Sequence, residues 1–177
     1  MLSPLQIQNI DRMFSVFDHD GNGLLEWADF ELMHDDVYRS FPGDPESVQG
    51  VRLRTAYQGV WDFLRKSADK DRDQVVSKDE FRVAYDADAE FSVQLVRYWE
   101  DVADALFDIA DGDADGYIDE PELTGIYTAA RVPGEVAAIA FRAMDGDGDG
   151  RIDAAEWRTS VQALFTSSEE SALLKGV

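Results

Sequence analysis

Carboxylate side chains recur at alternate positions in four short stretches of this sequence, with the spacing of a calcium-binding loop. Calcium takes six to eight oxygen ligands at roughly 2.3–2.6 Å, which such a loop supplies from side chains at positions 1, 3, 5, 9 and 12 and from the backbone carbonyl at position 7. Glycine at position 6 permits the left-handed backbone of the sharp turn. The third and fourth stretches fill every position, so both are predicted calcium sites. Their candidate ligands are Asp111, Asp113, Asp115, Tyr117 (carbonyl), Asp119 and Glu122, and Asp145, Asp147, Asp149, Arg151 (carbonyl), Asp153 and Glu156.

The first stretch, residues 18–29, departs from this pattern at its last position, where aspartate replaces glutamate. Its candidate ligands are Asp18, Asp20, Asn22, Leu24 (carbonyl), Glu26 and Asp29. Because the Asp29 side chain is one methylene shorter than glutamate, we expect it to supply one oxygen where glutamate supplies two. Magnesium prefers octahedral sites with six ligands, so the lower coordination number suits Mg²⁺. We therefore expect Mg²⁺ to compete with Ca²⁺ at this loop.

The second stretch, residues 69–80, keeps its acids but loses its glycine. The acids are Asp69, Asp71, Asp73 and Glu80. Position 6 is Gln74, and Lys70 and Arg72 add local positive charge. The sequence therefore predicts three calcium sites and leaves the fourth open.

Amphipathic helical patterns flank each of the four loops, with apolar residues three or four positions apart. Examples are Ile10, Phe14 and Phe17 before the first loop, and Leu95, Trp99, Val102 and Leu106 before the third. Loop position 8 is always apolar (Leu25, Val76, Ile118, Ile152), which fits a short strand that pairs two loops. The repeated helix–loop–helix pattern predicts an all-α fold of four units, arranged in two pairs and packed into one compact molecule.

Composition excludes several classes of function. With 37 acidic against 16 basic residues, the formal charge is −21, which repels nucleic acid and anionic membranes. There is no cysteine, no apolar run long enough to span a bilayer and no signal-peptide pattern, so we expect a cytoplasmic protein without a membrane partner. The two histidines show no catalytic context, and His19, at a loop position that supplies no ligand, is expected to be solvated. We predict no enzymatic activity.

The first loop and its surroundings (residues 17–26 and 28–30), with the gap of 51 residues from Asp18 to Asp69, resemble the family of calerythrin and the sarcoplasmic calcium-binding proteins. The resemblance covers nearly the whole chain. It implies two packed EF-hand pairs that act as a calcium buffer or transporter. We assign residues 1–88 to the first pair, 89–166 to the second and 167–177 to a tail. The joining segment is apolar (Val83, Tyr85, Phe91, Val93, Leu95, Val96, Tyr98, Trp99), so we expect it to pack both halves together.

Two roles remain open from the sequence. Sensors expose a methionine-rich groove on binding calcium, but this chain has four unclustered methionines and bulky aromatic residues on its helices, which favours a buffer. We also expect the protein to be a monomer. The alternative is a sensor for a protein partner that the sequence does not identify. In the tail, Leu173, Leu174 and Val177 are expected to plug an internal groove, and the alternative is a disordered end.

Overall fold

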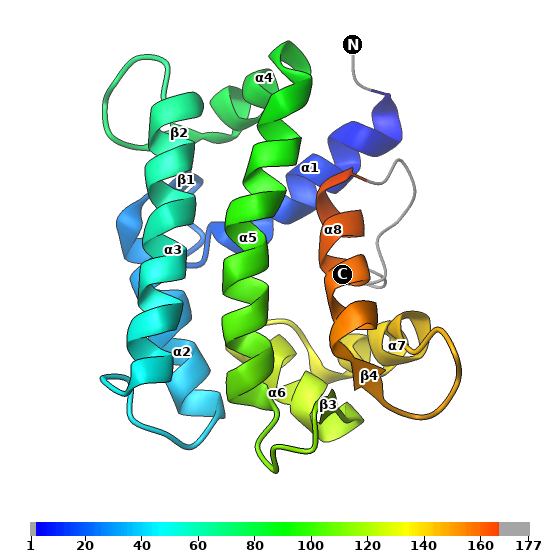
Figure 1. Ribbon diagram of the computed structural model, residues 1–177. Coiled ribbons are helices and arrows are strands. Elements are labelled where there is room, and N and C mark those ends of the chain that lie inside the picture. The colour runs from blue at the N-terminus through cyan, green and yellow to red at the C-terminus, as the bar shows by residue number, and fades with distance from the viewer. Residues whose placement is uncertain (1–2, 167–177) are drawn as a thin grey trace.

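The computed structural model describes residues 3–166, and the predicted tail plug lies outside these residues. Within these residues the chain folds into eight helices with four two-residue strands between them (Figure 1). In order, the elements are α1 (Pro4–Phe17), β1 (Leu24–Leu25), α2 (Trp27–Ser40), α3 (Val48–Ser67), β2 (Val76–Ser77), α4 (Lys78–Ala87), α5 (Ala89–Ala110), β3 (Tyr117–Ile118), α6 (Glu120–Ala129), α7 (Gly134–Met144), β4 (Ile152–Asp153) and α8 (Ala154–Thr166). None of the described helices has the length and hydropathy needed to cross a bilayer.

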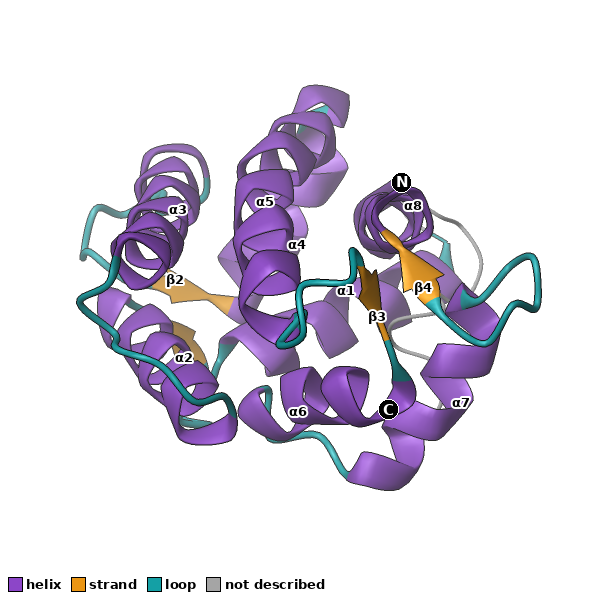
Figure 2. Cartoon of the chain, turned by 60° about the horizontal axis from the view of Figure 1, so that its bottom comes forward, coloured by secondary structure: helices purple, strands orange, loops and turns teal. Residues whose placement is uncertain are grey.

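Short antiparallel ribbons join the loops in pairs, as the apolar residues at loop position 8 predict (Figure 2). Strand β1 pairs with β2, with Leu25 opposite Val76, and β3 pairs with β4, with Ile118 opposite Ile152. All four of these side chains are fully buried. The predicted compact all-α fold of two EF-hand pairs is therefore confirmed.

The exiting helices begin at side-chain caps that belong to the loops. Ser77 caps α4 and Asp119 caps α6, each in a reciprocal capping box with the glutamate three residues later. Asp153 and Glu156 exchange the same two hydrogen bonds at the start of α8. The residue at loop position 12 is thus fixed to the first turn of the helix that leaves each of these loops.

The two halves share one core around α5, which packs against α3 on one side and α8 on the other (Figure 1). Helix α2 also packs against α6 and α1 against α8, so the halves contact each other away from α5 as well. As expected, four of the eight apolar residues of the joining segment are buried in this core: Phe91, Leu95, Val96 and Trp99. The expectation is wrong for Val83 and Val93, which are exposed. Tyr98 is partly exposed but still packs across the halves, because its ring stacks on Phe63 of α3 with 5.1 Å between the ring centroids.

Candidate metal centres

All four loops fold around the same hydrogen bond between position 1 and position 6. The carboxylate of the first aspartate accepts a hydrogen bond from the backbone N–H at position 6 of its loop. The donor–acceptor pairs are Gly23 to Asp18 (2.9 Å), Gln74 to Asp69 (3.1 Å), Gly116 to Asp111 (2.9 Å) and Gly150 to Asp145 (3.0 Å). The first ligand of each loop is therefore held in the same orientation.

The carboxylate at position 12 is held between two backbone N–H groups of its own loop, those of positions 2 and 9. Glu122 accepts from Gly112 (2.9 Å) and Asp119 (3.0 Å), and Glu156 accepts from Gly146 (2.8 Å) and Asp153 (3.0 Å). Asp29 makes the equivalent pair of bonds despite its shorter side chain, from His19 (2.9 Å) and Glu26 (2.9 Å). This arrangement connects each loop to its exiting helix through the carboxylate predicted to close the ligand shell.

Three carboxylates converge in each loop, with one oxygen of each lying within 4.8 Å of the other two. These groups are Asp18, Asp20 and Asp29; Asp69, Asp71 and Asp73; Asp111, Asp113 and Glu122; and Asp145, Asp147 and Glu156. The remaining predicted ligands lie in the same loops outside these groups: Asn22, Leu24, Glu26, Asp115, Tyr117, Asp119, Asp149, Arg151 and Asp153. Their part in coordination stays a prediction.

The first loop contains an oxygen whose surroundings fit a cation. Asp18 Oδ1 is buried and has no hydrogen-bond partner within residues 3–166. Asp29 is fully buried, and this burial raises its pKa because the N–H groups of Glu26, Asp20 and His19 only partly offset the lost hydration. A bound calcium or magnesium ion would supply the positive charge that both carboxylates need when ionised.

The second loop adopts the same backbone as the others although it lacks the glycine. Gln74 has a φ of 73°, against 86° for Gly116 and 85° for Gly150. At position 4, Arg72 is also left-handed, with a φ of 62°. A residue with a β-carbon is disfavoured in this region by roughly 1–2 kcal/mol, which weakens the loop without preventing it from forming.

In the same loop, hydrogen bonds favour the ionised form of Glu80. Its Oε1 accepts from the Lys70 N–H (3.0 Å) and its Oε2 from the Ser77 N–H (2.9 Å) and hydroxyl (2.8 Å). Burial alone would raise the pKa of Glu80, but these hydrogen bonds and one from the Asp71 N–H outweigh it and lower the pKa. The acid at position 12 therefore accepts the same two backbone hydrogen bonds as in the other loops, and one of its oxygens also accepts from the Ser77 hydroxyl.

Comparison with known proteins identifies the family. A model described as EF hand matches residues 102–126 and 137–161, and a model described as EF-hand domain pair matches residues 4–31. These segments contain the third, fourth and first loops. The chain is an EF-hand protein.

Its relatives confirm the resemblance to calerythrin and the sarcoplasmic calcium-binding proteins. This EF-hand protein is 29% identical to calerythrin from Saccharopolyspora erythraea over 146 residues, which make up 79% of this chain and 80% of calerythrin. A calcium-binding protein from Streptomyces coelicolor superposes with a TM-score of 0.79 at 28% identity, over 90% of this chain and 96% of that one. A sarcoplasmic calcium-binding protein from amphioxus shares the fold, with a TM-score of 0.71 at 19% identity over 97% and 95% of the two chains. The chain thus belongs to a family of calcium-binding proteins.

One residue of the first EF-hand loop differs from the sequence-based expectation. His19 is buried, with 6% of its surface exposed, so the prediction of a solvated side chain is wrong. Its Nε2 lies 2.8 Å from Asp36 Oδ2 on α2. The acid that pairs with His19 lies 17 residues later in the sequence, and no loop pattern signals it.

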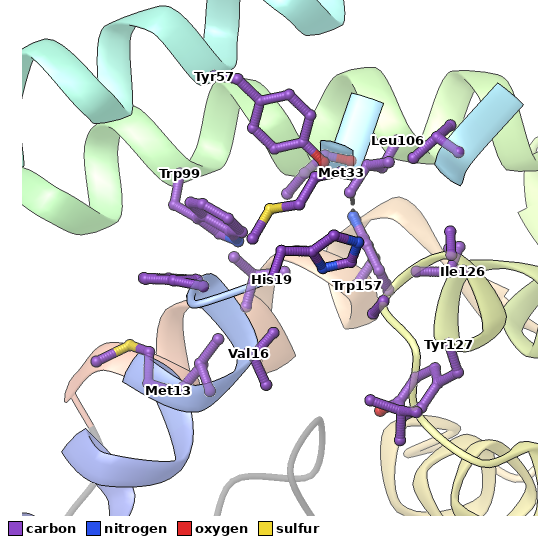
Figure 3. Close-up of a pocket in the computed structure, with 18 residues that line it drawn as sticks. Met13, Val16, His19, Met33, Tyr57, Trp99, Leu106, Ile126, Tyr127 and Trp157 are labelled. Carbon is purple, nitrogen blue, oxygen red and sulfur yellow. Dashed lines mark hydrogen bonds between the residues drawn. The ribbon is translucent and has the colours of Figure 1, made fainter. Parts of the chain in front are cut away.

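A cavity of about 120 Å³ lies at the centre of the EF-hand protein, between the two halves. Its walls come from α1, α2, α3, α5, α6 and α8, and they include Met13, Met33, Tyr57, Trp99 and Trp157. Figure 3 shows the His19 side chain among these apolar groups, so the first loop forms part of the wall. The indole N–H of Trp157 does not face a free site, because it donates to the Ala103 carbonyl at 2.9 Å.

Proposed function

We propose that this protein is a calcium buffer that binds calcium at the first, third and fourth loops, with a weaker fourth site at the second loop. The observation that carries the proposal is the geometry shared by the first, third and fourth loops, in which the carboxylates of positions 1, 3 and 12 converge and the position-12 carboxylate accepts from the N–H groups of positions 2 and 9. In the second loop the carboxylates of positions 1, 3 and 5 converge instead. A cytoplasmic location and a monomeric state stay predictions.

The shared core supports a buffer over a sensor. Helix α5 packs against helices of both halves, and the ring centroids of Phe17 and Trp99 lie only 4.5 Å apart across them. A sensor opens to expose a groove, and such an opening would separate these contacts.

The sensor role remains the second candidate because of two observations. Two methionines, Met13 and Met33, line the central cavity, so opening of the halves would expose a flexible apolar surface. The related Streptomyces coelicolor protein is described as acting in calcium-mediated regulation.

Two measurements test these roles. Calorimetric titration with calcium in the presence of magnesium is expected to show at least three binding events, and the absence of calcium binding would refute the proposal. Fluorescence of a hydrophobic dye is then expected to fall when calcium saturates the protein, because the apo state closes. A rise in dye fluorescence would instead favour the sensor.

A further inference from the structure

Helix α6, which leaves the third loop, ends in a turn that ordinarily contains glycine. The N–H of Val132 donates to the Tyr127 carbonyl at 2.9 Å, and the N–H of Arg131 donates to the Thr128 carbonyl at 3.0 Å. These two bonds form a Schellman motif, whose residue after the C-cap is left-handed and is usually glycine. Here that residue is Arg131, with a φ of 58°. An arginine at this position is disfavoured by its backbone, and such a conformation persists where the surrounding structure holds the residue in place.

The Arg131 side chain reaches across to the first helix–loop–helix unit (α1, the first loop and α2). Its Nε donates to Asp36 Oδ2 at 2.8 Å, and its Nη1 donates to the His19 carbonyl at 3.0 Å. Asp36 is nearly buried on α2 and also pairs with Arg39 and with the His19 ring. The guanidinium therefore contacts both the first loop and the helix that leaves it.

The backbone of His19 contacts both Arg131 and a candidate calcium ligand. Its carbonyl accepts from Arg131, whereas its N–H donates to Asp29 Oδ1 at 2.9 Å. At the equivalent position the other loops have Lys70, Gly112 and Gly146, all of them exposed. In the first loop alone, position 2 is buried and bonded on both sides.

A continuous connection thus joins two loops of different pairs. Glu122 lies in the first turn of α6 and Arg131 follows the last turn of the same helix. The Arg131 guanidinium donates a hydrogen bond to the His19 carbonyl, and the His19 N–H donates a hydrogen bond to Asp29. Packing of α2 against α6 runs beside this connection.

We propose that Arg131 is a positioning residue that couples the first calcium loop to the third, so that calcium bound at the third loop raises calcium affinity at the first. The proposal rests on the proposed function, since it requires both loops to bind calcium. By linkage, calcium at the first loop raises affinity at the third by the same factor. An effect of about fivefold or more is expected, as is usual for coupled sites.

The test measures occupancy of each loop separately. The N–H groups of Gly23, Gly116 and Gly150 each donate to the first aspartate of their own loop, so their amide NMR signals report calcium binding loop by loop. Calcium titrations would be followed in the wild-type protein, in Glu122→Gln, in Arg131→Gly and in the double variant. Arg131→Gly removes the guanidinium and keeps a residue that favours the left-handed turn, so the fold is expected to persist.

Glu122→Gln is expected to weaken calcium binding at Gly23 about fivefold or more in the wild-type background and to have no such effect in the Arg131→Gly background. The matched control is Arg39→Ala, which removes a second arginine from Asp36 without touching the first loop. It is expected to leave the Gly23 titration unchanged.

Two results would contradict the coupling and leave the proposed function intact. The first is a calcium titration of the Gly23 signal that is the same in Arg131→Gly as in the wild-type protein. The second is an effect of Glu122→Gln on the Gly23 titration that is as large in the Arg131→Gly background as in the wild-type background. If the three glycine signals of the wild-type protein did not respond to calcium at all, the proposed function would fail and the coupling with it.

Discussion

The ring centroids of Phe17 and Trp99 lie 4.5 Å apart, although Phe17 ends the helix that enters the first loop and Trp99 lies in the helix that enters the third. Both rings also lie near Phe165 of α8, at 6.3 Å and 6.0 Å. One aromatic cluster therefore connects helices that belong to three different hands. This shared packing holds the two halves together, in addition to the chain that joins them.

We expect Phe17→Ala to lower the free energy of unfolding by about 3–5 kcal/mol, because it leaves a cavity among buried rings. Urea denaturation followed by circular dichroism and by tryptophan fluorescence would measure the change. Both signals are expected to report one transition, since the halves share a core. Val83→Ala, at an exposed position of α4, is the control and should change stability by less than about 0.5 kcal/mol. A loss below about 1 kcal/mol for Phe17→Ala would contradict the shared core.

Gln74→Gly is expected to stabilise the second loop by about 1 kcal/mol, because the native φ of 73° is readily adopted by glycine. Since the acids of the loop already converge, calcium affinity there should rise. Calorimetry would detect a fourth binding event that is tighter than in the wild-type protein. The reverse change, Gly150→Gln in the fourth loop, is the matched control and should weaken binding. Equal affinities of the second loop in the wild-type protein and in Gln74→Gly would show that the backbone strain does not limit this site.

Asp29→Glu is expected to raise the selectivity of the first loop for calcium over magnesium. A longer side chain, held by the same N–H groups of His19 and Glu26, would extend its carboxylate further toward the ion and provide a second oxygen. Competition titrations with both ions would measure the ratio of affinities. Glu122→Asp makes the opposite change in the third loop and should lower the same ratio there. If Asp29→Glu unfolded the protein, the reverse variant alone would still test the role of side-chain length.

Calcium should raise the melting temperature of the protein markedly. The apo chain has a formal charge of −21, and three bound calcium ions reduce this to −15 while relieving repulsion within each carboxylate group. Binding to the folded state alone stabilises it by about 4 kcal/mol at a thousandfold excess over Kd. Thermal scans with calcium and with a chelator would show the shift. Sodium chloride at equal ionic strength is the control, because it screens repulsion without occupying the loops.

The ion pair between α1 and α4 makes stability depend on pH. Two hydrogen bonds from Arg82 (2.7 and 2.6 Å) lower the pKa of Asp11, and nearby Lys78 adds to this against the effect of burial. Because the folded pKa is depressed, the pair contributes stability above the unfolded pKa of about 3.9, and this contribution is lost as pH falls through the folded pKa. Asp11→Asn should therefore lower stability by up to about 1 kcal/mol at neutral pH and by nothing in strong acid.

Urea denaturation of calcium-free protein at the two pH values would measure this difference. The control is Asp79→Asn, whose carboxylate is mostly exposed and contacts Arg82 only at 3.4 Å. A difference between the wild-type protein and Asp11→Asn that stayed constant with pH would rule out the ion pair as its source.

The sequence predicted the parts of this molecule that depend on local spacing. The apolar position 8 and the flanking helices each follow from a pattern within a dozen residues and appear in the structure, and three acids converge in each loop, while their role as ligands stays a prediction. The left-handed Gln74 could not be foreseen, because the pattern treats glycine as required whereas the remaining hydrogen bonds of the loop compensate its absence. The environment of His19 depends on Asp36 and on Arg131, which lies 112 positions further along the chain. Contacts of this kind arise from the packing of the halves and leave no local signal.

The ribbon that places Leu25 opposite Val76 has a consequence for how such a chain can change over generations. A substitution in the second loop can weaken its ion chemistry with little effect elsewhere. Deletion of that loop would leave the backbone of β1 without its partner and uncover a fully buried leucine. A duplicated unit of this type can therefore lose its ligand, but it cannot be discarded. Hands that no longer bind an ion are expected to persist as scaffolding for the neighbour that does.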